Sequence, residues 1–510
     1  MISVRYRLGE LADAVDAVAA ELASADAVAR LWGRDHTLFQ DDPADCANRM
    51  GWLDSPPESS EAWDDLVAFA AEIAENSDDV VLMGMGGSSL FPEVLTQTFA
   101  SGEGYPTLHV IDSTDPDAVR RVLDATDPAR TFHVASSKSG STLETRSHLE
   151  LFWARSGDPD RFAVITDPGS ALATLATERS FRHTFLNNPD IGGRYAALSL
   201  FGMVPAALID ADGDAILEAA LDMGDALEPL DGEDESNVGL RLAATFGAAA
   251  RAGREQLTIV VTPALASFGL WLEQLVAEST GKHGTGIIPV IGEPTATICA
   301  TPDRRLIVTI GDVAEANELR ACGAPVVELS LEELTDVGAQ VLLWEFAVAL
   351  AGKALGINPF DQPDVEAAKQ AARQLLDSAA PAAPDATPLA EALAAVRPGD
   401  CVAVCAFVDP GSEIASTIAA FRDRVGAEHG VASTLGFGPR FLHSTGQLHK
   451  GGPASIVVLQ FATDVDEAHE LAIPGQSFGF GAFKMAQAAG DLTALAASGH
   501  RAFRVEVDEL

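Results

Sequence analysis

The stretch TFHVASSKSGSTLET, residues 131–145, contains the pattern from which the organisation of the chain can be predicted. Residues 132–135 are an apolar run, which predicts a short buried strand. Residues 136–141 are glycine or small polar residues except for Lys138, and the apolar side chains that follow have helical spacing. The stretch therefore predicts a strand, a hydroxyl-rich loop and the start of a helix.

A hydroxyl-rich loop that leads into a helix predicts an anion site. The N–H groups of the loop and the positive end of the helix dipole point toward one place, and Ser and Thr hydroxyls add further donors. The ligand that this arrangement favours is a phosphate carried by a small molecule. The alternative is an ordinary capped helix after a strand, because Ser and Thr are good N-cap residues.

Composition indicates a large globular protein with two or three domains. The chain has 510 residues, of which 47% are hydrophobic and 21% are charged. No apolar run reaches the roughly 18 residues of a membrane span, and the N-terminus has the pattern of an amphipathic helix rather than an export signal. Five scattered cysteines indicate neither disulfides nor a metal site. We therefore expect a cytoplasmic protein without a membrane partner.

The charge of the chain limits its partners. A net charge of −42 argues against nucleic acid, because phosphate backbones would be repelled. An anionic small molecule would also be repelled at long range, so a phosphate site has to be locally positive. The chain has only six lysines against 27 arginines, and four of the six lie in polar motifs: Lys138, Lys282, Lys369 and Lys450.

Apolar strands alternate with helices along most of the chain. Such strands predict parallel sheets covered on both faces, so we expect an α/β fold of two doubly wound domains and a smaller α/β unit. An acidic linker at 228–236 and a Pro/Ala-rich stretch at 378–388 mark the boundaries. The predicted units are a segment of helix and loop (1–60) interrupted by Pro43, Pro56 and Pro57, a first domain (61–227), a second domain (237–377) and a C-terminal unit (389–510).

A second glycine-rich loop, GMGGSS at residues 84–89, follows the predicted strand before it. Ligands of parallel sheets bind at the carboxyl ends of the strands. A dinucleotide loop of the form G-x-G-x-x-G would need glycine at position 89, where Ser89 stands. A loop for a small phosphate or sugar fits better, since its tight glycine turn allows close approach of the backbone.

Four further stretches are dense in polar residues that are useful in catalysis. They are IGGRYAALSLFG (191–202, with Arg194), WLEQLVAESTGKHG (271–284, with Gln274, Glu278 and Lys282), GINPFDQPDVEAAK (356–369, with Lys369) and GFGPRFLHSTGQLHKGGP (436–453, with Arg440, His443, His449 and Lys450). Each also has a structural interpretation. Arg194 could be an ion-pair partner, Glu278 and Lys369 could be solvated helix residues, and the histidines could be polar loop residues.

Together these motifs resemble the phosphoglucose isomerase family. SKSGSTLET, GGRY, ESTGK and FDQPDVE-x2-K appear in the family's order and cover roughly residues 80–370. One position departs from the pattern, because Asp364 stands where the family has Gly or Ala. The stretch 436–453 resembles the isomerase half of transaldolase–phosphoglucose isomerase fusion proteins. The chain begins with Met and leaves no room for a transaldolase barrel, so we expect a stand-alone isomerase.

The resemblance implies two sugar isomerase (SIS) domains and the interconversion of glucose 6-phosphate and fructose 6-phosphate in glycolysis and gluconeogenesis. The reaction would pass through a cis-enediol without a metal or cofactor. By position, Glu278 would be the base that moves a proton between C1 and C2, Arg194 would stabilise the enediolate and Lys369 would assist ring opening. These roles suit the chemistry, since a weakly acidic C–H next to a carbonyl needs a placed carboxylate and a cation for the oxyanion. The substrate-binding residues implied are Gly87, Ser88, Ser137, Lys138 (mainly through its backbone), Ser139, Thr142 and Gln274.

The ring-opening histidine is where the chain departs from the family. Relatives have it between the Glu motif and the FDQ motif, but residues 284–359 contain no histidine. We expect the C-terminal unit to supply it, with His449 as first choice and His443 as second, because their loop is glycine-rich and basic. His283 is the remaining candidate near the Glu motif, and we expect it to be a loop residue.

Two other functions stay open at this point. The substrate could be another sugar phosphate, such as mannose 6-phosphate or an amino sugar phosphate. The chain could also be a non-catalytic SIS-type sensor, although a sensor has no use for Glu278, Arg194 and Lys369 together. Relatives are commonly dimers that share the active site, so a homodimer is an expectation, while the extra C-terminal unit could replace what a partner provides.

Overall fold

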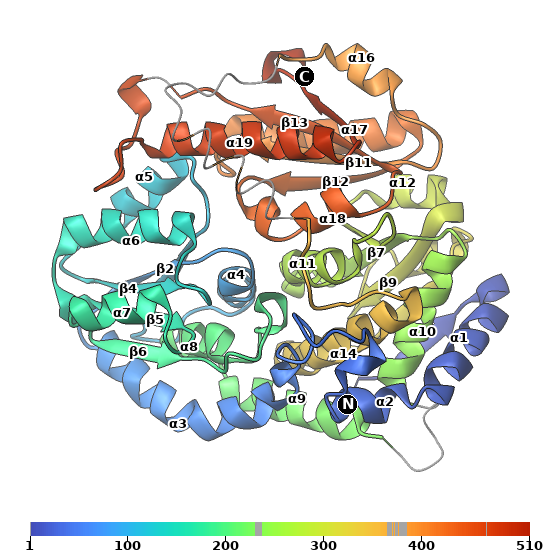
Figure 1. The fold of residues 1–510 in the computed structure, drawn as a ribbon, viewed down its shortest axis with the longest axis horizontal. Helices are drawn as coiled ribbons and strands as arrows, with labels where there is room; N and C mark the ends of the chain where they lie inside the picture. The colour runs from blue at the N-terminus through green and yellow to red at the C-terminus, as the bar shows by residue number, and fades with distance from the viewer. Residues whose placement is uncertain are drawn as a thin grey trace.

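A computed structural model of the chain describes residues 2–229, 237–364, 385–465 and 467–510, together with residues 370, 372 and 376. Three sheets with helices around them make up this part of the chain (Figure 1). The first and the third sheet are parallel throughout, and the second is parallel except for one edge strand. The predicted α/β class is confirmed.

The first sheet has the strand order β3-β2-β4-β5-β6. All residues of β4 and β5 are buried, as expected for strands that are covered on both faces. Of the next two strands in the sequence, β3 pairs with β2 on one side and β4 pairs with it on the other. The topological switch point therefore lies between β2 and β4. The strands are β2 (Asp79–Met83), β3 (Thr107–Ile111), β4 (Thr131–Ser136), β5 (Phe162–Thr166) and β6 (His183–Leu186). Between and after them run α4 (Leu90–Thr98), α5 (Pro116–Ala125), α6 (Leu143–Ser156), α7 (Ala171–Glu178), α8 (Leu200–Leu208) and α9 (Gly213–Leu227).

The second sheet has the order β1-β10-β9-β7-β8, and its edge strand comes from the N-terminus. The strands are β1 (Val4–Arg7), β7 (Gln256–Val261), β8 (Ile288–Ile291), β9 (Arg305–Ile310) and β10 (Val326–Leu329). Helices α10 (Val238–Arg251), α11 (Phe268–Thr280), α12 (Thr295–Ala300), α13 (Ala316–Ala321) and α14 (Val337–Leu355) belong to this lobe.

The N-terminal segment differs from the prediction of helix and loop alone. The strand β1 pairs antiparallel with β10, so this segment completes the second sheet, and α1 (Ala12–Ser24) and α2 (Ala27–Trp32) follow it. Pro56 and Pro57 do not interrupt a helix but lie in the first turn of α3 (Ser55–Ala74). Proline is tolerated there because the N–H groups of a first turn have no partner within the helix.

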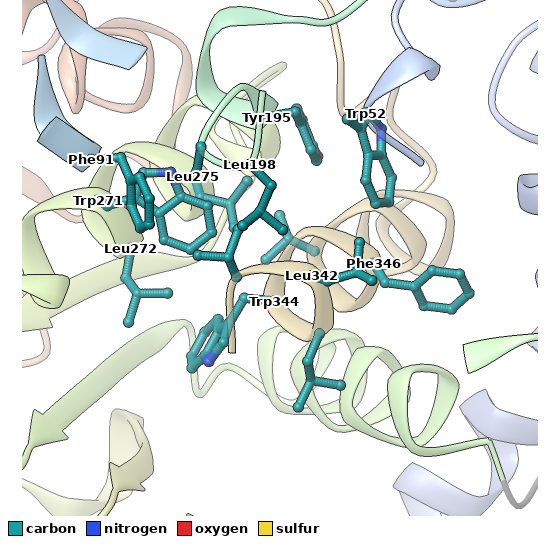
Figure 2. Close-up of a cluster of buried hydrophobic side chains, with 14 of the residues drawn as sticks. Trp52, Phe91, Tyr195, Leu198, Trp271, Leu272, Leu275, Leu342, Trp344 and Phe346 are labelled. Atoms are coloured by element: carbon teal, nitrogen blue, oxygen red, sulfur yellow. The ribbon is translucent and has the colours of Figure 1, made fainter. Parts of the chain in front are cut away.

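Helix α14 is buried on all sides and forms the centre of the largest hydrophobic core (Figure 2). The segment Leu334–Leu355, which contains α14, is long and apolar enough to cross a membrane, contrary to the expectation from the sequence, but 83% of its most apolar window is buried inside the protein. Trp344 and Phe346 on this helix are fully buried, as are Trp271 and Phe91 near its side. Because it is buried, we assign this helix to the core of the protein.

The third sheet belongs to the C-terminal unit and has the order β12-β11-β13-β14. The C-terminal unit shares a hydrophobic core with each of the other two lobes: Phe480 and Phe483 pack with the first, and Cys401 and Phe441 pack with the second. In Figure 1 it lies across the top of both. Its elements are α16 (Leu389–Ala394), β11 (Cys401–Phe407), α17 (Glu413–His429), β12 (Ala432–Phe437), α18 (Gly446–Gly451), β13 (Ile456–Ala462), α19 (Phe480–Ala497) and β14 (Arg501–Arg504).

Candidate active site

A cavity of about 400 Å³ lies where loops that follow strands of the first and third sheets meet helix α11 of the second lobe. Its first wall is the switch point of the first sheet, because residues that follow β2 and β4 line it. The second wall comes from α11, and the C-terminal unit closes the cavity with Leu442 and His443. The predicted site residues that line it are Gly87, Ser88, Ser137, Lys138, Ser139, Thr142, Arg194, Gln274, Glu278 and His443.

The loop between β4 and α6 gathers hydroxyl groups at the start of α6. Gly140, whose φ of +65° suits glycine, makes the turn, and its N–H donates to Ser137 Oγ at 3.2 Å. Ser137 Oγ lies 3.2 Å from Thr142 Oγ1, and Thr142 occupies the N-cap position without capping α6 through its side chain. Among the described residues, the buried Ser136 hydroxyl has no hydrogen-bond partner. The Ser136 hydroxyl also lines the cavity, and together with the backbone at the start of α6 it gives a phosphate a suitable set of donors.

Lys138 contributes little free positive charge to this loop. Its Nζ donates to Asp167 Oδ2 at 2.5 Å and to the carbonyl oxygen of Pro189 at 2.7 Å. Burial raises the pKa of Asp167, and the hydrogen bond from Lys138 opposes that shift. The loop therefore offers a ligand mainly its backbone and its hydroxyls.

Helix α11 presents Gln274 and Glu278 to the cavity one helical turn apart. The Glu278 side chain is almost completely buried, and its Oε2 lies 3.5 Å from Arg194 Nη1. Two amides also donate to this oxygen, Gln274 Nε2 at 3.3 Å and Gln362 Nε2 at 3.4 Å. These donors fix the position of the carboxylate, whose ionised form is the one that can accept a proton from a ligand.

Arg194 is held in place by groups other than Glu278. Its Nε donates to Ser279 Oγ at 2.9 Å, and its Nη2 donates to the carbonyl oxygens of Pro359 at 2.5 Å and Asp361 at 3.2 Å. The guanidinium also lies 5.7 Å from the centre of the Tyr195 ring. These contacts place a fixed cation beside the carboxylate.

His443 is the histidine of the C-terminal unit that lines the cavity. Its Nε2 lies 2.9 Å from Glu144 Oε1, at the first turn of α6, and its carbonyl oxygen accepts from Gln274 Nε2 at 2.8 Å. A carboxylate beside an imidazole determines which ring nitrogen carries the proton and how the ring is oriented. His443 thus presents an oriented imidazole to the cavity.

The first choice from the sequence, His449, does not lie in this cavity. Helix α18 turns its side chain into a separate cavity of about 190 Å³, where Nδ1 lies 3.9 Å from Cys405 Sγ. Burial lowers the pKa of His449 to about 3. An imidazole of that kind stays neutral near pH 7, so it is a poor proton shuttle. His283 is exposed and also lies outside the cavity.

Asp364, the residue that departs from the family pattern, forms hydrogen bonds with the C-terminal unit. The N–H of Asp364 donates to Gln447 Oε1 at 3.0 Å, and Gln447 Nε2 donates back to Asp364 Oδ2 at 2.6 Å. Gln447 Nε2 also donates to the carbonyl oxygen of Gly281, so one buried amide joins the Glu motif to the FDQ motif. Lys369, which follows in that motif, lies outside the described residues.

Comparison with known proteins identifies the family. A family model described as phosphoglucose isomerase matches residues 67–300. A glucose-6-phosphate isomerase of Nostoc sp. is 30% identical over 354 residues, which cover 60% of this chain and 67% of that protein. The chain belongs to the phosphoglucose isomerase family. A glucose-6-phosphate isomerase of Rubrobacter xylanophilus is 28% identical over 355 residues, covering 58% of this chain and 82% of that protein.

Solved structures share the phosphoglucose isomerase fold. A hypothetical protein of Thermus thermophilus superimposes with a TM-score of 0.63 at 24% identity, covering 74% of this chain and all of that one. A glucose-6-phosphate isomerase of Chlamydia trachomatis superimposes with a TM-score of 0.54 at 22% identity, covering 69% of this chain and 77% of that one.

Three residues that line or adjoin the site in this member of the phosphoglucose isomerase family were not predicted from the sequence. Glu144 belongs to the SKSGSTLET motif, and its position in the first turn of a helix that follows an anion loop is a signal from which it could have been predicted. Gln362 stands in the FDQ motif. Arg49, which lines the cavity from the N-terminal segment, follows no recognisable pattern. In the part of the chain that the structure describes, no group of three or more His, Cys, Asp or Glu side chains is arranged to hold a metal ion.

Proposed function

We propose that this chain interconverts glucose 6-phosphate and fructose 6-phosphate by moving a proton between C1 and C2. The observation that carries the proposal is that the Glu278–Arg194 pair and the hydroxyl loop around Ser137 and Thr142 line one cavity. Its volume of about 400 Å³ suits a six-carbon monophosphate.

The phosphate would bind at the start of α6, on Ser137, Ser139, Thr142 and the backbone of Lys138. Gly87 and Ser88 would line the sugar, and Gln274 would contact its carbon chain. Binding energy from the phosphate, remote from the reacting carbons, would hold C1 and C2 against the Glu278 carboxylate.

Glu278 would remove the proton from C2 of the open-chain aldose while the C1 carbonyl oxygen becomes an enediolate oxygen. Arg194 would stabilise that oxyanion, because its cation is already fixed beside the base and needs no rearrangement. The same carboxylic acid would return the proton to C1, the O2 proton would move to O1, and the ketose would result. Both carbons lie within reach of one carboxylate in a planar enediol.

His443 would act before this step, exchanging protons with the ring oxygen and the C1 hydroxyl of the cyclic sugar. Its contact with Glu144 supports this role, since a carboxylate beside an imidazole fixes which ring nitrogen carries the proton and which faces the ligand. Lys369 stays a prediction for the same step.

The direct test is to incubate the purified protein with fructose 6-phosphate and follow the formation of glucose 6-phosphate. Glu278→Gln is expected to abolish turnover and to retain binding of 6-phosphogluconate, an open-chain sugar-acid phosphate. Binding without turnover by the wild-type protein would support the sensor function instead, and turnover by Glu278→Gln would remove the assigned base. Mannose 6-phosphate, assayed in parallel, tests the alternative substrate.

We further propose that the protein works in the cytoplasm, in glycolysis and gluconeogenesis. The chain itself supplies His443 to the cavity, which supports activity without a shared site, whereas the family resemblance favours a homodimer. Sedimentation velocity combined with activity measurements across protein concentrations would separate these two possibilities. The net charge of −42 argues against nucleic acid as a partner.

A further inference from the structure

We propose that Gln487, on helix α19 of the C-terminal unit, is a positioning residue that orients Glu144 toward His443. The inference rests on the proposed role of His443 in ring opening and adds to it a residue that no motif identified. Gln487 does not line the cavity, so it would act through Glu144 and not by touching the sugar.

The hydrogen bonds of Gln487 determine which way its amide faces. Its Nε2 donates to Glu144 Oε1 at 2.7 Å, and its Oε1 accepts from Thr114 Oγ1 at 2.7 Å. An ionised carboxylate can only accept, so the NH2 group has to face Glu144, and the amide oxygen is left for the Thr114 hydroxyl. All three side chains are buried.

Glu144 Oε1 therefore receives two groups, the amide of Gln487 and the imidazole of His443 at 2.9 Å. The amide of Gln487 therefore fixes the same carboxylate oxygen that faces His443. It also limits rotation of the carboxylate. An ionised, fixed Glu144 would hold the proton of His443 on Nε2 and leave Nδ1 for the sugar.

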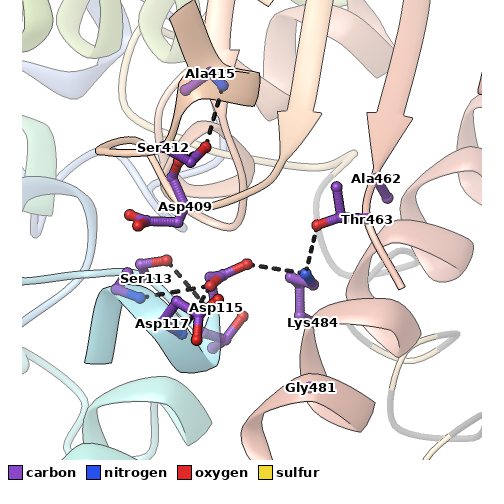
Figure 3. A network of polar contacts seen from close by, with 12 residues as sticks. Ser113, Asp115, Asp117, Asp409, Ser412, Ala415, Ala462, Thr463, Gly481 and Lys484 are labelled. Atoms are coloured by element: carbon purple, nitrogen blue, oxygen red, sulfur yellow. Dashed lines mark hydrogen bonds and ion pairs between the residues drawn. The ribbon is translucent and has the colours of Figure 1, made fainter. Parts of the chain in front are cut away.

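Helix α19 is anchored firmly enough to act as a support. One turn before Gln487, the buried Lys484 donates to Asp115 Oδ2 at 2.9 Å and to Thr463 Oγ1 at 3.1 Å (Figure 3). Thr114 and Asp115 are neighbours in the loop after β3, so positions 484 and 487 of α19 hold the same loop of the first lobe. At the start of α19, Phe480 stacks on His148 of α6, with ring centres 5.2 Å apart.

These hydrogen bonds link the C-terminal unit to Glu144, the carboxylate that contacts His443. His443 and Gln487 both come from that unit and reach Glu144 of the first lobe from different elements. The loss of Gln487 should weaken ring opening and leave proton transfer at Glu278 unchanged, because within the described part of the chain none of its hydrogen bonds reaches the base.

The test compares a cyclic with an acyclic substrate. Fructose 6-phosphate has to be opened, whereas D-erythrose 4-phosphate cannot form a five-membered ring because its 4-hydroxyl carries the phosphate. Gln487→Met should lower kcat for fructose 6-phosphate by about 10- to 100-fold and change turnover of erythrose 4-phosphate less than about twofold. A residue that positions the acid–base group should carry only part of the roughly 100- to 10,000-fold that general acid–base catalysis contributes. Gln487→Glu puts a second carboxylate beside Glu144 and should move the pH profile of the cyclic substrate toward higher pH.

Gln460 provides a matched control. It is a buried amide on β13 that donates to the carbonyl oxygen of Ala488 on α19 at 3.0 Å, and no hydrogen bond joins it to Glu144 among the described residues. Gln460→Met should leave the ratio of cyclic to acyclic turnover unchanged. If Gln460→Met changes the ratio of cyclic to acyclic turnover as much as Gln487→Met does, any disturbance of α19 has the same effect. That result would overturn the inference.

The remaining outcomes separate this inference from the proposed function. If His443→Gln keeps the wild-type ratio, the ring-opening role of His443 is wrong. If His443→Gln loses cyclic turnover and Gln487→Met does not, only the positioning role is wrong. Should Gln487→Met fail to fold, Thr114→Val is the second variant, since it removes the hydroxyl that orients the amide and should move the ratio in the same direction.

Discussion

The Arg194 guanidinium lies 3.5 Å from the Glu278 carboxylate, and the two side chains are only 1% and 5% exposed. Burying two charges costs free energy, which their attraction offsets only when further hydrogen bonds satisfy both groups. Ser279, two backbone carbonyls and two glutamine amides supply those bonds here. The base and the cation of the proposed reaction are thus in place before a substrate binds.

Arg194→Lys should lower kcat for fructose 6-phosphate by about 100- to 1,000-fold, the range seen when a fixed donor for an oxyanion is lost. Lysine keeps the charge but has no planar fork to reach Ser279 and the two carbonyls together. Arg194→Met should also lower the free energy of unfolding by about 3–5 kcal/mol, because Glu278 would be buried without its cation. Steady-state kinetics and urea unfolding measure the two effects, and a fully active Arg194→Lys would contradict the assigned role.

Thr142→Val should lower kcat/KM about 10- to 100-fold, since a hydrogen bond to a charged group is worth about 1.5–3 kcal/mol. The fold should be little affected, because Thr142 makes no side-chain cap bond to α6. Ser170→Ala is the matched control: the Ser170 hydroxyl caps the neighbouring helix α7 at 3.0 Å and does not line the cavity. It should lose about 1 kcal/mol of stability and keep its kcat/KM. Equal kinetic effects in both variants would argue against a phosphate on Thr142.

His449 should make the fold sensitive to acid. Burial lowers its pKa from 6.5 to about 3, so the unfolded chain binds the proton more readily than the folded one between these values. The free energy of unfolding should therefore fall as pH decreases below 6.5, by up to about 1.4 kcal/mol per pH unit from this group. Urea unfolding at pH 6.5 and 5 should show a smaller loss in His449→Gln than in the wild type. His429→Gln, at an exposed position, should keep the wild-type loss.

The positions of the strands and helices that hold the site residues could be predicted from the sequence, but which of their side chains contact one another could not. The strand predicted at 132–135, the helix predicted after residue 141 and the strand predicted before the loop 84–89 are observed as β4, α6 and β2, because their apolar patterns are local. His443 and His449 lie six residues apart in one polar stretch, and the sequence ranked them in the wrong order for the cavity. Their ranking depends on how α18 turns against β11, which is a tertiary property.

The N-terminal strand and Glu144 show two other limits of local patterns. Val4 and Tyr6 alternate with arginines, which is a strand signal, but four residues are too few to outweigh the helix that follows, and the partner β10 is more than 300 residues away. The motif that contains Glu144 was quoted, yet its carboxylate gained a role only once His443 and Gln487 were brought to it from the C-terminal unit.

Gly87→Ala should lower stability and activity far more than Gly193→Ala, although the two glycines lie against each other. A Cβ on Gly87 would overlap the carbonyl oxygen of Gly193, a backbone atom that cannot move without shifting Arg194 beside it. A Cβ on Gly193 would meet no atom of the other described residues within 4 Å, its two chain neighbours aside. We expect Gly87→Ala to lower the free energy of unfolding by about 1–3 kcal/mol and to remove most activity, since overpacking displaces the backbone at the site. Thermal unfolding should show no comparable loss in Gly193→Ala, and equal stability of the two variants would contradict the close approach of these loops.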